Sequence, residues 1–486
     1  MVIQKPRVFT PIECNGEISY IESLMCHKKV YVKSFGCQMN KLDTALVTSA
    51  LEDAGFSFTP SVKEADVVLI NTCSVRDHAE QRVLSHLGHL KHMKRSRPDL
   101  VVGVIGCMAQ RLGDRLLEHE AVNIVCGPAE IPQISDFVAK AVQDRQKALA
   151  VTERIRHKGS QQQSQALEEF ESVYGIEKEQ IPAQAFVRVM RGCNNFCSYC
   201  VVPYVRGPEV SRSPEAIIEQ IRKLAEHGVK QVTLLGQRVN SYKYKHGGKI
   251  WSLADLLEAA GDIAGIEWLR FVTSYPSEEF FDQIIEVMAG SPKVCEYLHM
   301  PAQSGSDRIL KAMNRNYTSR WYLELLERAR QIVPEIAIAG DFIVGFPGES
   351  EEDFQATVNL LEKARYKNTF VFKYSPRPGT NSDQRLTDTV AAKVKQRRNV
   401  ELLAVQERIS DELSRQFLNR EVKVLVEGLS KKPHLNMADA GDNPQLVART
   451  AGDWIVVFNG PESLTGKFAN VKIESASPLT LFGRPI

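Results

Sequence analysis

The chain has 486 residues, of which 43% are hydrophobic and 25% are charged, and its formal net charge is +2. This composition is ordinary for globular domains, and the length predicts two to four of them. The sequence has no run of eighteen apolar residues, so we expect no transmembrane helix and no membrane partner. The net charge is too small to demonstrate a nucleic-acid partner by itself.

The ten cysteines are sparse and partly clustered, which suits metal binding in a reducing cytosol better than a disulfide framework. Residues 1–27 contain three glutamates and no long apolar run, so they are typical of neither a secretory signal nor a transit peptide. We therefore expect a cytoplasmic protein with an N-terminal tail over 1–27, in which Cys14 and Cys26 are incidental thiols.

Residues 28–142 alternate short apolar runs with amphipathic stretches, the pattern of a parallel α/β sheet domain. The expected strands are 30–35, 67–70, 101–105 and 122–125.

Three cysteines, Cys37, Cys73 and Cys107, each fall one to three residues beyond one of these strands. Because the carboxyl ends of parallel strands lie along one edge, the three thiols can converge on a metal. On geometry alone, three buried apolar cysteines are an equally good interpretation. Cys126 also follows a strand, but Gly127 and Pro128 indicate a turn there, so it ranks lower.

A second cysteine motif, C-x3-C-x2-C, reads CNNFCSYC at 193–200. Thiolates favour zinc or iron–sulfur clusters. Structural zinc needs a fourth ligand, and no second C-x2-C or H-x3-H pair follows in the next sixty residues. An iron–sulfur cluster normally takes four cysteines, so three would leave one iron open for chemistry. A disrupted zinc knuckle and buried structural cysteines are the alternatives.

A Gln-rich linker is expected over 143–182, followed by six strand–helix units within 183–418. Such units predict an incomplete (β/α)6 barrel whose function lies at the carboxyl ends of its strands. A long basic helix over 386–418 closes this region, and its charges, Lys395 and Arg398 among them, are interpreted as a solvated face.

Several residues at these strand ends are candidates for a pocket, although Gly and Ser there are often only turn residues. They are Gly236, Gln237, Asn240, Ser274, Gln303, Ser304 and Glu349. His299 and Asp341 lie inside expected strands, where barrel packing is at least as good an interpretation as catalysis.

Residues 419–486 alternate apolar and polar positions and predict a small antiparallel β-barrel. Lys431, Lys432 and Arg449 are candidates for phosphate contacts, and Trp454 for stacking on a base.

Several motifs resemble a known family. The 193–200 motif, with Tyr199 before its last cysteine, resembles the radical S-adenosylmethionine (SAM) enzymes. GCQMN (36–40), NTCSVR (71–76) and GCMAQ (106–110) resemble the three cysteine motifs of the methylthiotransferases, and 419–486 resembles the RNA-binding TRAM domain. CVVPYVRG (200–207), 236–242 and MNRNYT (313–318) resemble the MiaB-type tRNA branch. Arg238 stands where that family more often has Asn, which puts one SAM contact in question.

The resemblance implies two 4Fe-4S clusters and SAM as cofactors, with the strand-end residues contacting SAM. Cys193, Cys197 and Cys200 would bind one cluster and leave one of its irons open to SAM. The other would carry the sulfur on Cys37, Cys73 and Cys107.

The implied reaction is methylthiolation of C2 of N6-isopentenyl(dimethylallyl)adenosine beside the tRNA anticodon, with two SAM consumed. A C2–H is not acidic enough for a side-chain base, so a radical is required. The implied partners are the tRNA anticodon stem-loop and a low-potential electron donor such as flavodoxin or ferredoxin, and the enzyme would be a monomer.

Three alternatives stay open. A RimO-type enzyme would methylthiolate an aspartate of a ribosomal protein, and an MtaB-type enzyme would modify threonylcarbamoyladenosine. The VVPY and QRVNSY segments argue against both. An RNA-binding iron–sulfur electron carrier is the alternative from another class, and formation of 5′-deoxyadenosine would exclude it.

Overall fold

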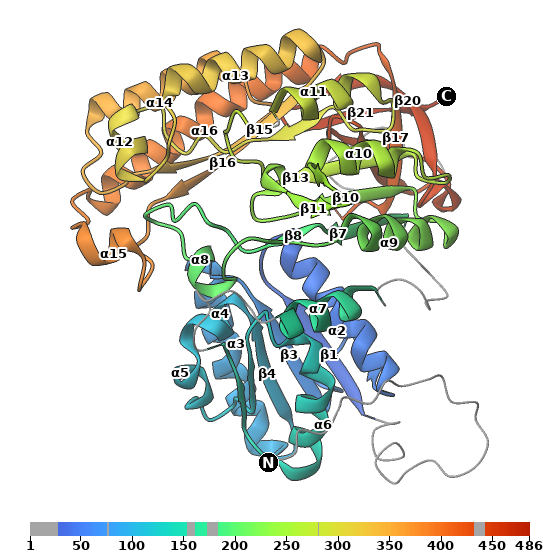
Figure 1. Ribbon diagram of the computed structural model, residues 1–486, viewed down its shortest axis with the longest axis vertical. Coiled ribbons are helices and arrows are strands. Elements are labelled where there is room, and N and C mark those ends of the chain that lie inside the picture. Colours follow the sequence, from blue (N-terminus) through green and yellow to red (C-terminus); the bar gives the residue numbers. More distant parts are fainter. Residues whose placement is uncertain (1–27, 75–76, 153–160, 173–182, 280, 432–442) are drawn as a thin grey trace.

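The structure is a computed structural model that describes residues 28–74, 77–152, 161–172, 183–279, 281–431 and 443–486. An N-terminal sheet, an arc of strands and helices, and a closed β-barrel make up three bodies, with the N-terminal sheet and the closed barrel on different sides of the arc (Figure 1). The expected tail over 1–27 lies outside the described residues. Over the described ranges, no helix combines the length and apolarity needed to cross a bilayer.

The N-terminal body is a six-stranded parallel sheet in the order β2-β1-β3-β4-β5-β6, which confirms the expected parallel sheet and adds β2 and β6 to the four expected strands. The strands are β1 (Lys29–Ser34), β2 (Ser57–Phe58), β3 (Val67–Thr72), β4 (Val101–Gly106), β5 (Ile124–Cys126) and β6 (Ala148–Ala150). The helices are α2 (Gln38–Asp53), α3 (Asp77–Ser96), α4 (Cys107–Leu112), α5 (Asp114–Leu117) and α6 (Ile134–Asp144). Both β3 and β4 are wholly buried, which explains their continuous apolar runs. β6 falls within the stretch expected as a linker and extends the sheet.

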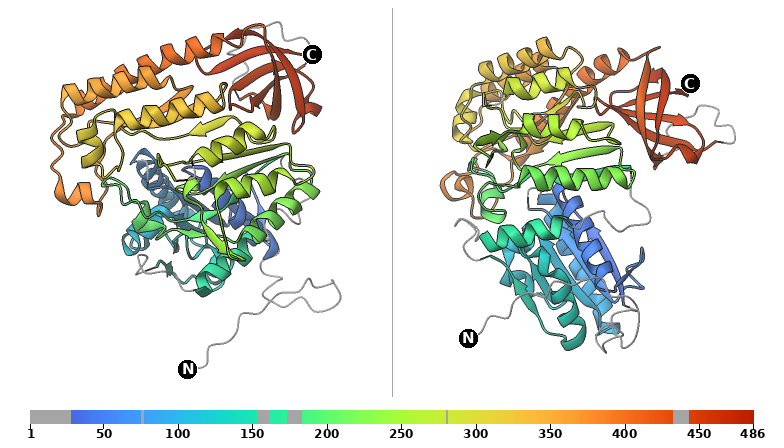
Figure 2. Two further views of the ribbon diagram at one scale, coloured as in Figure 1. Left: turned by 45° about the horizontal axis from the view of Figure 1, so that its top comes forward. Right: turned by 45° about the vertical axis from the view of Figure 1, so that its right-hand side comes forward.

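The central body is an open arc of six parallel strands with helices outside it, which confirms the incomplete barrel (Figure 2). The strands are β7 (Gln184–Arg188), β10 (Gln231–Leu235), β13 (Trp268–Val272), β14 (Tyr297–His299), β15 (Ala337–Val344) and β16 (Asn368–Lys373). The helices that follow them are α9 (Pro214–Glu226), α10 (Leu253–Gly261), α11 (Phe281–Gly290), α12 (Asp307–Ala312), α13 (Ser319–Ile332) and α14 (Glu351–Ala364). The six strands form two three-stranded sheets, in the orders β13-β10-β7 and β14-β15-β16. A β-bridge between Leu269 and Val294 joins the two sheets, so β7 and β16 form the two ends of the arc.

Helix α2 of the N-terminal body packs against the concave side of this arc. Its residues Met39, Leu42 and Leu46 are buried in one apolar cluster with inward-facing residues of β10, β13, β14 and β15. Those strand residues are Leu235, Val272, Tyr297, Ala337 and Ala339. The cysteine edge of the N-terminal sheet, where α2 begins, is thereby brought to the inside of the arc.

Helix α7 (Gln161–Ser172) lies in the expected linker and is fixed by charge. The Glu171 carboxylate is buried, 3.0 Å from Nη1 of Arg188 and 3.2 Å from Nη1 of Arg212, and it also pairs with Arg191. These guanidinium groups hold the pKa of Glu171 at about 2, although burial alone would raise it.

Helix α16 (Ala392–Arg415) corrects one expectation, because two of its basic side chains are buried rather than solvated. Lys395 donates from Nζ to Asp388 at 2.8 and 2.6 Å, and Arg398 pairs with Glu349 at 2.7 Å. Lys395 Nζ also donates to Tyr374 O at 3.2 Å, so the contacts with Tyr374 and Glu349 attach the helix to the outside of the arc, while Asp388 lies in the segment that leads into it.

The C-terminal body is a closed barrel in the order β17-β18-β19-β21-β20. Its strands are β17 (Glu421–Leu429), β18 (Gln445–Thr450), β19 (Ile455–Asn459), β20 (Phe468–Ala476) and β21 (Thr480–Pro485). The expected small barrel is confirmed, except that the β19–β21 pair is parallel. Trp454 is 5% exposed and packs in the barrel core, so its expected role in base stacking is wrong.

Candidate functional site

The motif at 193–200 forms a loop after β7 and the short strand β8 (Met190–Arg191), at the carboxyl end of the first strand of the arc. Cys200 N donates to Cys197 O at 2.9 Å, and Cys193 N donates to Gly207 O at 3.1 Å, so the loop is folded back on itself. Burial raises the pKa of Cys193 to about 11, because a thiolate is poorly solvated there. Cys197 is buried, and Cys200 is half-buried.

The MNRNYT segment holds this loop from the other side of the arc. Asn314 donates from Nδ2 to the carbonyls of Asn195 and Phe196 at 3.2 and 3.0 Å. Arg315 is buried, donates to Cys197 Sγ at 3.5 Å and lies 4.6 Å from the ring centroid of Tyr275. A fixed positive charge therefore lies against the sulfur of the middle cysteine.

The other three cysteines lie at one edge of the N-terminal sheet, as expected from their strand positions. Cys37 is the N-cap of α2 after β1, Cys73 directly follows β3, and Cys107 opens α4 after β4. These three strands are adjacent in the sheet. The pKa of Cys37 is lowered to about 6, first by a hydrogen bond with Cys73, while burial opposes the shift and the charge of Arg206 supports it.

Paired amides and a glycine bring these strand ends close together. Asn40 donates from Nδ2 to Asn71 Oδ1 and to Thr72 O, both at 2.9 Å, and Asn71 Nδ2 returns a bond to Asn40 O at 2.9 Å. Gly106 has φ +93°, and a Cβ there would lie 2.7 Å from Thr72 O. The glycine in the GCMAQ motif is therefore required by close approach of β3 and β4.

The two cysteine sets are joined by Arg206, which ends the short helix α8 (Val202–Val205) downstream of Cys200. Its Nε donates to Cys107 Sγ at 3.3 Å, and its Nη2 donates to Asp43 Oδ2 at 2.9 Å. Asp43 also pairs with Arg188 at the end of β7. Cys107 further packs against Val201 and Val205, so the loop of the first set rests directly on the second.

Of the described residues, no three His, Cys, Asp or Glu side chains are gathered so that they could hold a metal ion. The fit to metal clusters therefore depends on the donor chemistry, on the strand positions and on the two arginines that face sulfur. Cys126 does not share this setting. It is fully buried in the apolar core on α2 and α6, and burial raises the pKa of its thiol.

Some of the strand-end candidates carry buried polar atoms that lack a hydrogen-bond partner among the described residues. These atoms are Gln237 Oε1 and Nε2, Ser274 Oγ and Glu349 Oε1, and Nε2 of His299, the last residue of β14, likewise lacks a hydrogen-bond partner there. Buried polar groups are normally paired, so such a concentration at the carboxyl ends of β10, β13 and β14 indicates a ligand site. Thr273, a β-branched residue, has φ +72°, and this strained conformation positions Ser274.

Other candidates are already bonded within the protein. Asn240 holds Tyr275 through bonds of 2.7 and 2.8 Å, and a Cβ at Gly236 would lie 2.7 Å from Met190 Cγ. Gln303 has φ +70° and is bridged to Phe342. Ser304 Oγ lies 3.3 Å from Thr357 Oγ1 on α14.

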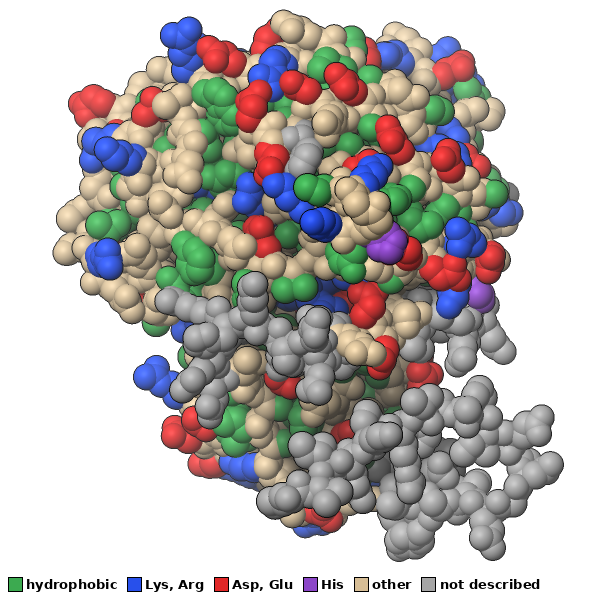
Figure 3. Space-filling model, viewed as in Figure 1, with side chains coloured by type: hydrophobic (Ala, Val, Ile, Leu, Met, Phe, Trp, Pro, Cys, Tyr) green, Lys and Arg blue, Asp and Glu red, His purple; other side chains and the backbone are tan. Residues whose placement is uncertain are grey.

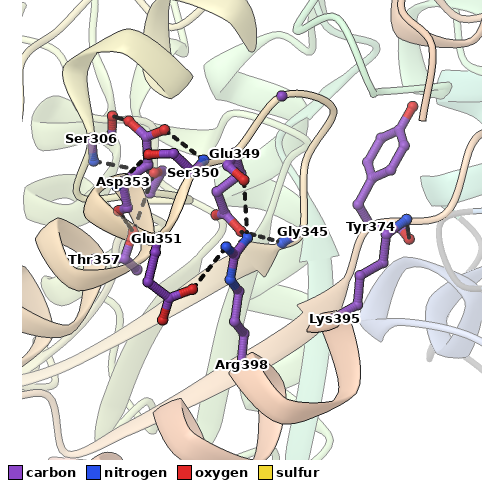
Figure 4. Close-up of polar contacts among 12 residues, drawn as sticks. Ser306, Gly345, Glu349, Ser350, Glu351, Asp353, Thr357, Tyr374, Lys395 and Arg398 are labelled. Atoms are coloured by element: carbon purple, nitrogen blue, oxygen red, sulfur yellow. Dashed lines mark hydrogen bonds and ion pairs between the residues drawn. The ribbon is translucent and has the colours of Figure 1, made fainter. Parts of the chain in front are cut away.

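Glu349 lies just before α14, and its carboxylate points to Gly345 and to Arg398 of α16 (Figure 4). It accepts from Gly345 N at 2.6 Å and pairs with Arg398 at 2.7 Å. Burial raises its pKa, against the effect of Gly345 and Arg398. Its carboxylate thus holds the turn after β15.

Arg238, which departs from the family pattern, lies beside the cysteine loop. It donates to Asn195 Oδ1 at 3.2 Å, lies 3.8 Å from Glu209 and is 5.0 Å from the ring centroid of Tyr275.

The sequence did not identify Asp43, Arg188, Arg206 or Arg315 as site residues. Arg206 and Arg315 stand inside the motifs CVVPYVRG and MNRNYT, which is the signal that could have identified them.

Three family models match the chain: Uncharacterized protein family UPF0004 over 29–127, the Radical SAM superfamily over 187–361 and the TRAM domain over 415–486. A solved radical S-adenosylmethionine methyltransferase, TsrM from Kitasatospora setae, has a TM-score of 0.53 at 17% identity and covers 73% of this chain and 77% of its own. That likeness supports the fold.

Curated relatives match almost end to end. A tRNA-2-methylthio-N(6)-dimethylallyladenosine synthase of Rhodopirellula baltica is 42% identical over 94% of this chain and 95% of its own length. One of the same name from Bacteroides fragilis is 39% identical over 95% and 96%. The chain therefore belongs to the radical SAM family of tRNA-2-methylthio-N(6)-dimethylallyladenosine synthases.

Proposed function

We propose that this chain is a tRNA methylthiotransferase that places a methylthio group on C2 of N6-isopentenyl(dimethylallyl)adenosine next to the anticodon. The observation that carries the proposal is the contact between two three-cysteine sets through Arg206, at the mouth of a radical SAM arc. One cysteine set alone would support SAM cleavage. The second set would hold the sulfur that is transferred, next to the site of SAM cleavage.

Cys193, Cys197 and Cys200 would hold one 4Fe-4S cluster, and Cys37, Cys73 and Cys107 the other. When bound, the clusters supply the electron that cleaves SAM to a 5′-deoxyadenosyl radical and the sulfur that is transferred. Arg315 and Arg206 each place a positive charge against a cysteine sulfur, which would balance negative charge on a cluster bound there. Cys126 has no part in this assignment, because it lies in the apolar core.

SAM would occupy the strand ends that carry unpartnered polar atoms, with Gln237 and Ser274 as its direct contacts. Gly236 would act indirectly, by letting the turn after β10 approach Met190 closely, and Gln303 would line the same mouth. Asn240, Ser304 and Glu349 would act as positioning residues through Tyr275, Thr357 and Gly345, to which they are bonded. Arg238 would lie at the rim beside Asn195.

The enzyme would bind its substrate tRNA at the anticodon stem-loop. Positive and negative side chains are interspersed over the face seen in Figure 3, so we do not assign RNA binding to that face as a whole. The TRAM barrel supplies exposed Lys431 and Lys467. Arg449 is a weaker candidate, since Glu427 and Asp453 pair with it at 3.0 and 3.1 Å, and Lys432 lies outside the described residues.

The remaining assignments are a cytoplasmic location, a monomeric enzyme and an electron donor such as flavodoxin or ferredoxin.

Nucleoside mass spectrometry tests the proposed methylthiolation of tRNA. Anaerobically reconstituted protein is given SAM, a reductant and tRNA that carries isopentenyladenosine. The methylthio nucleoside should appear, and should be absent with Cys197→Ala. Unchanged tRNA despite SAM cleavage would instead favour the ribosomal-protein or threonylcarbamoyladenosine substrate.

A further inference from the structure

Two aromatic side chains lie on β16, the strand at one end of the arc. Phe370 is 47% exposed although its side chain is large and aromatic. The rings of Phe370 and Phe372 have centroids 6.4 Å apart and an interplanar angle of 18°, so they are nearly parallel. An exposed aromatic face of this kind is what proteins use to stack an unpaired base.

The strand register shows which way these rings point. Val371 packs with the outer helices, and its carbonyl accepts from Asn399 of α16 at 2.9 Å. Side chains alternate along a strand, so Phe370 and Phe372 point to the opposite, concave side. In the parallel register with β15, Phe370 is opposite Asp341 and Phe372 is opposite Ile343.

The same concave face leads to both cysteine sets. Ile343 packs in a cluster with Tyr199, which stands between Cys197 and Cys200. Further along β15, Ala337 and Ala339 pack with α2 in the cluster that Cys37 also contacts. The aromatic pair therefore lies on a surface that borders the first set at one end and the second set at the other.

This face also carries polar groups. His299 Nε2 lies 3.5 Å from Asp341 Oδ1 but makes no hydrogen bond within the described part of the chain. A carboxylate and an imidazole beside an aromatic face and an apolar side chain match the chemistry of a purine. Asp341 can accept from an exocyclic N–H, Phe370 can stack on the ring, and Ile343 with Phe372 can contact an apolar substituent.

We propose that Phe370, supported by Phe372 and bordered by Asp341, binds the unstacked target base of the RNA, an adenine with an apolar group on N6. This inference rests on the proposed function and adds the position of the base: on β16, between the two cysteine sets. The base leaves its stack in the RNA and regains a stacking partner on the protein.

Binding of a fluorescein-labelled anticodon stem-loop that carries isopentenyladenosine, measured by anisotropy with the holoenzyme, tests the proposal. Phe370→Ala and Phe370→Leu should each weaken binding roughly tenfold, because stacking is lost, while Phe370→Trp should bind like the wild type. Ile250→Ala is the matched control, since Ile250 is 57% exposed on a separate hairpin of β11 (Tyr244–His246) and β12 (Lys249–Trp251), outside the strands of the arc.

Formation of 5′-deoxyadenosine without RNA should be unchanged in all these variants, which shows that the protein remains intact. Binding by Phe370→Leu that equals wild-type binding would overturn the assignment of Phe370. Failure of the wild-type enzyme to convert the same stem-loop would contradict the proposed function instead, so the two failures are distinguishable.

Discussion

The Nε atom of Arg206 donates a hydrogen bond to Sγ of Cys107 across 3.3 Å. Arg206 belongs to the loop of the radical SAM cysteines, and Cys107 belongs to the N-terminal sheet. One guanidinium group, on a side chain that is 7% exposed and has Asp43 as its counter-ion at 2.9 Å, therefore connects two cysteine sets that lie far apart in the sequence.

Replacing Arg206 should change the electronic properties of the second site. A positive charge beside a cysteine sulfur stabilises the reduced, more negative form of a cluster, so Arg206→Met should lower its reduction potential. Arg206→Lys should lower it less, because the charge is kept. Redox titration followed by EPR measures the shift, with Arg320→Met as the control, since Arg320 is highly exposed. An unchanged potential in Arg206→Met would contradict this role.

Replacing Cys73 and replacing Cys126 should have different effects on the iron content of the protein. Cys73→Ala should lose the iron of one cluster, because Cys73 follows β3 at the cysteine edge. Cys126→Ala should keep all its iron and lose only on the order of 1 kcal/mol of stability from the small cavity in the core. Iron and sulfide analysis after anaerobic reconstitution measures both. Loss of iron in Cys126→Ala would show that Cys126 is a ligand after all.

Lys367 should make stability depend on pH between about 8 and 10.5. Burial lowers the pKa of Lys367 to about 8, although Asp453 beside it acts in the opposite direction. Because the folded pKa lies below the unfolded value of 10.5, the unfolded chain binds more protons in this window and stability rises with pH.

The rise should reach roughly 3 kcal/mol across the window and should be absent in Lys367→Met. Anaerobic thermal melts of both proteins between pH 7.5 and 10.5 measure it as a growing difference in Tm in favour of the wild type. If the curves of Tm against pH run parallel for the two proteins, Lys367 does not contribute this pH dependence.

Gly305 should not tolerate a side chain. A Cβ there would lie 2.2 Å from the backbone carbonyl oxygen of Ala356 on α14, and this contact cannot relax by rotation of a side chain. We expect Gly305→Ala to cost about 1–3 kcal/mol and to slow SAM cleavage by displacing the turn that follows β14. Gly290→Ala is the control, because nothing lies within 4 Å of its Cβ position. Equal Tm values for the two variants would contradict this packing.

The sequence could predict that three cysteines meet at one edge of a parallel sheet, because the signal is local. Each of Cys37, Cys73 and Cys107 follows an apolar run, and parallel strands place such positions at one edge without further information. The barrel strands were predictable for the same reason, since their apolar runs alternate with amphipathic helices.

The charged network was not predictable, because a charged residue on an amphipathic helix is usually solvated. Asp43 meets Arg188 only after α2 packs into the arc, across 145 positions of sequence. Arg398 of α16 was misjudged in the same way, since its partner Glu349 comes from the loop before α14, and Lys395 is buried against Tyr374 O, which follows β16. The parallel β19–β21 pair likewise depends on barrel closure, which no local pattern encodes.

The most direct test of the account measures two products in one reaction, with tRNA that carries isopentenyladenosine as the substrate. The wild type should form both 5′-deoxyadenosine and the methylthio nucleoside. Cys73→Ala should form 5′-deoxyadenosine alone, because SAM cleavage depends on the set at 193–200 and the transferred sulfur on the set that includes Cys73. Methylthio nucleoside made by Cys73→Ala would contradict the division of work between the two cysteine sets.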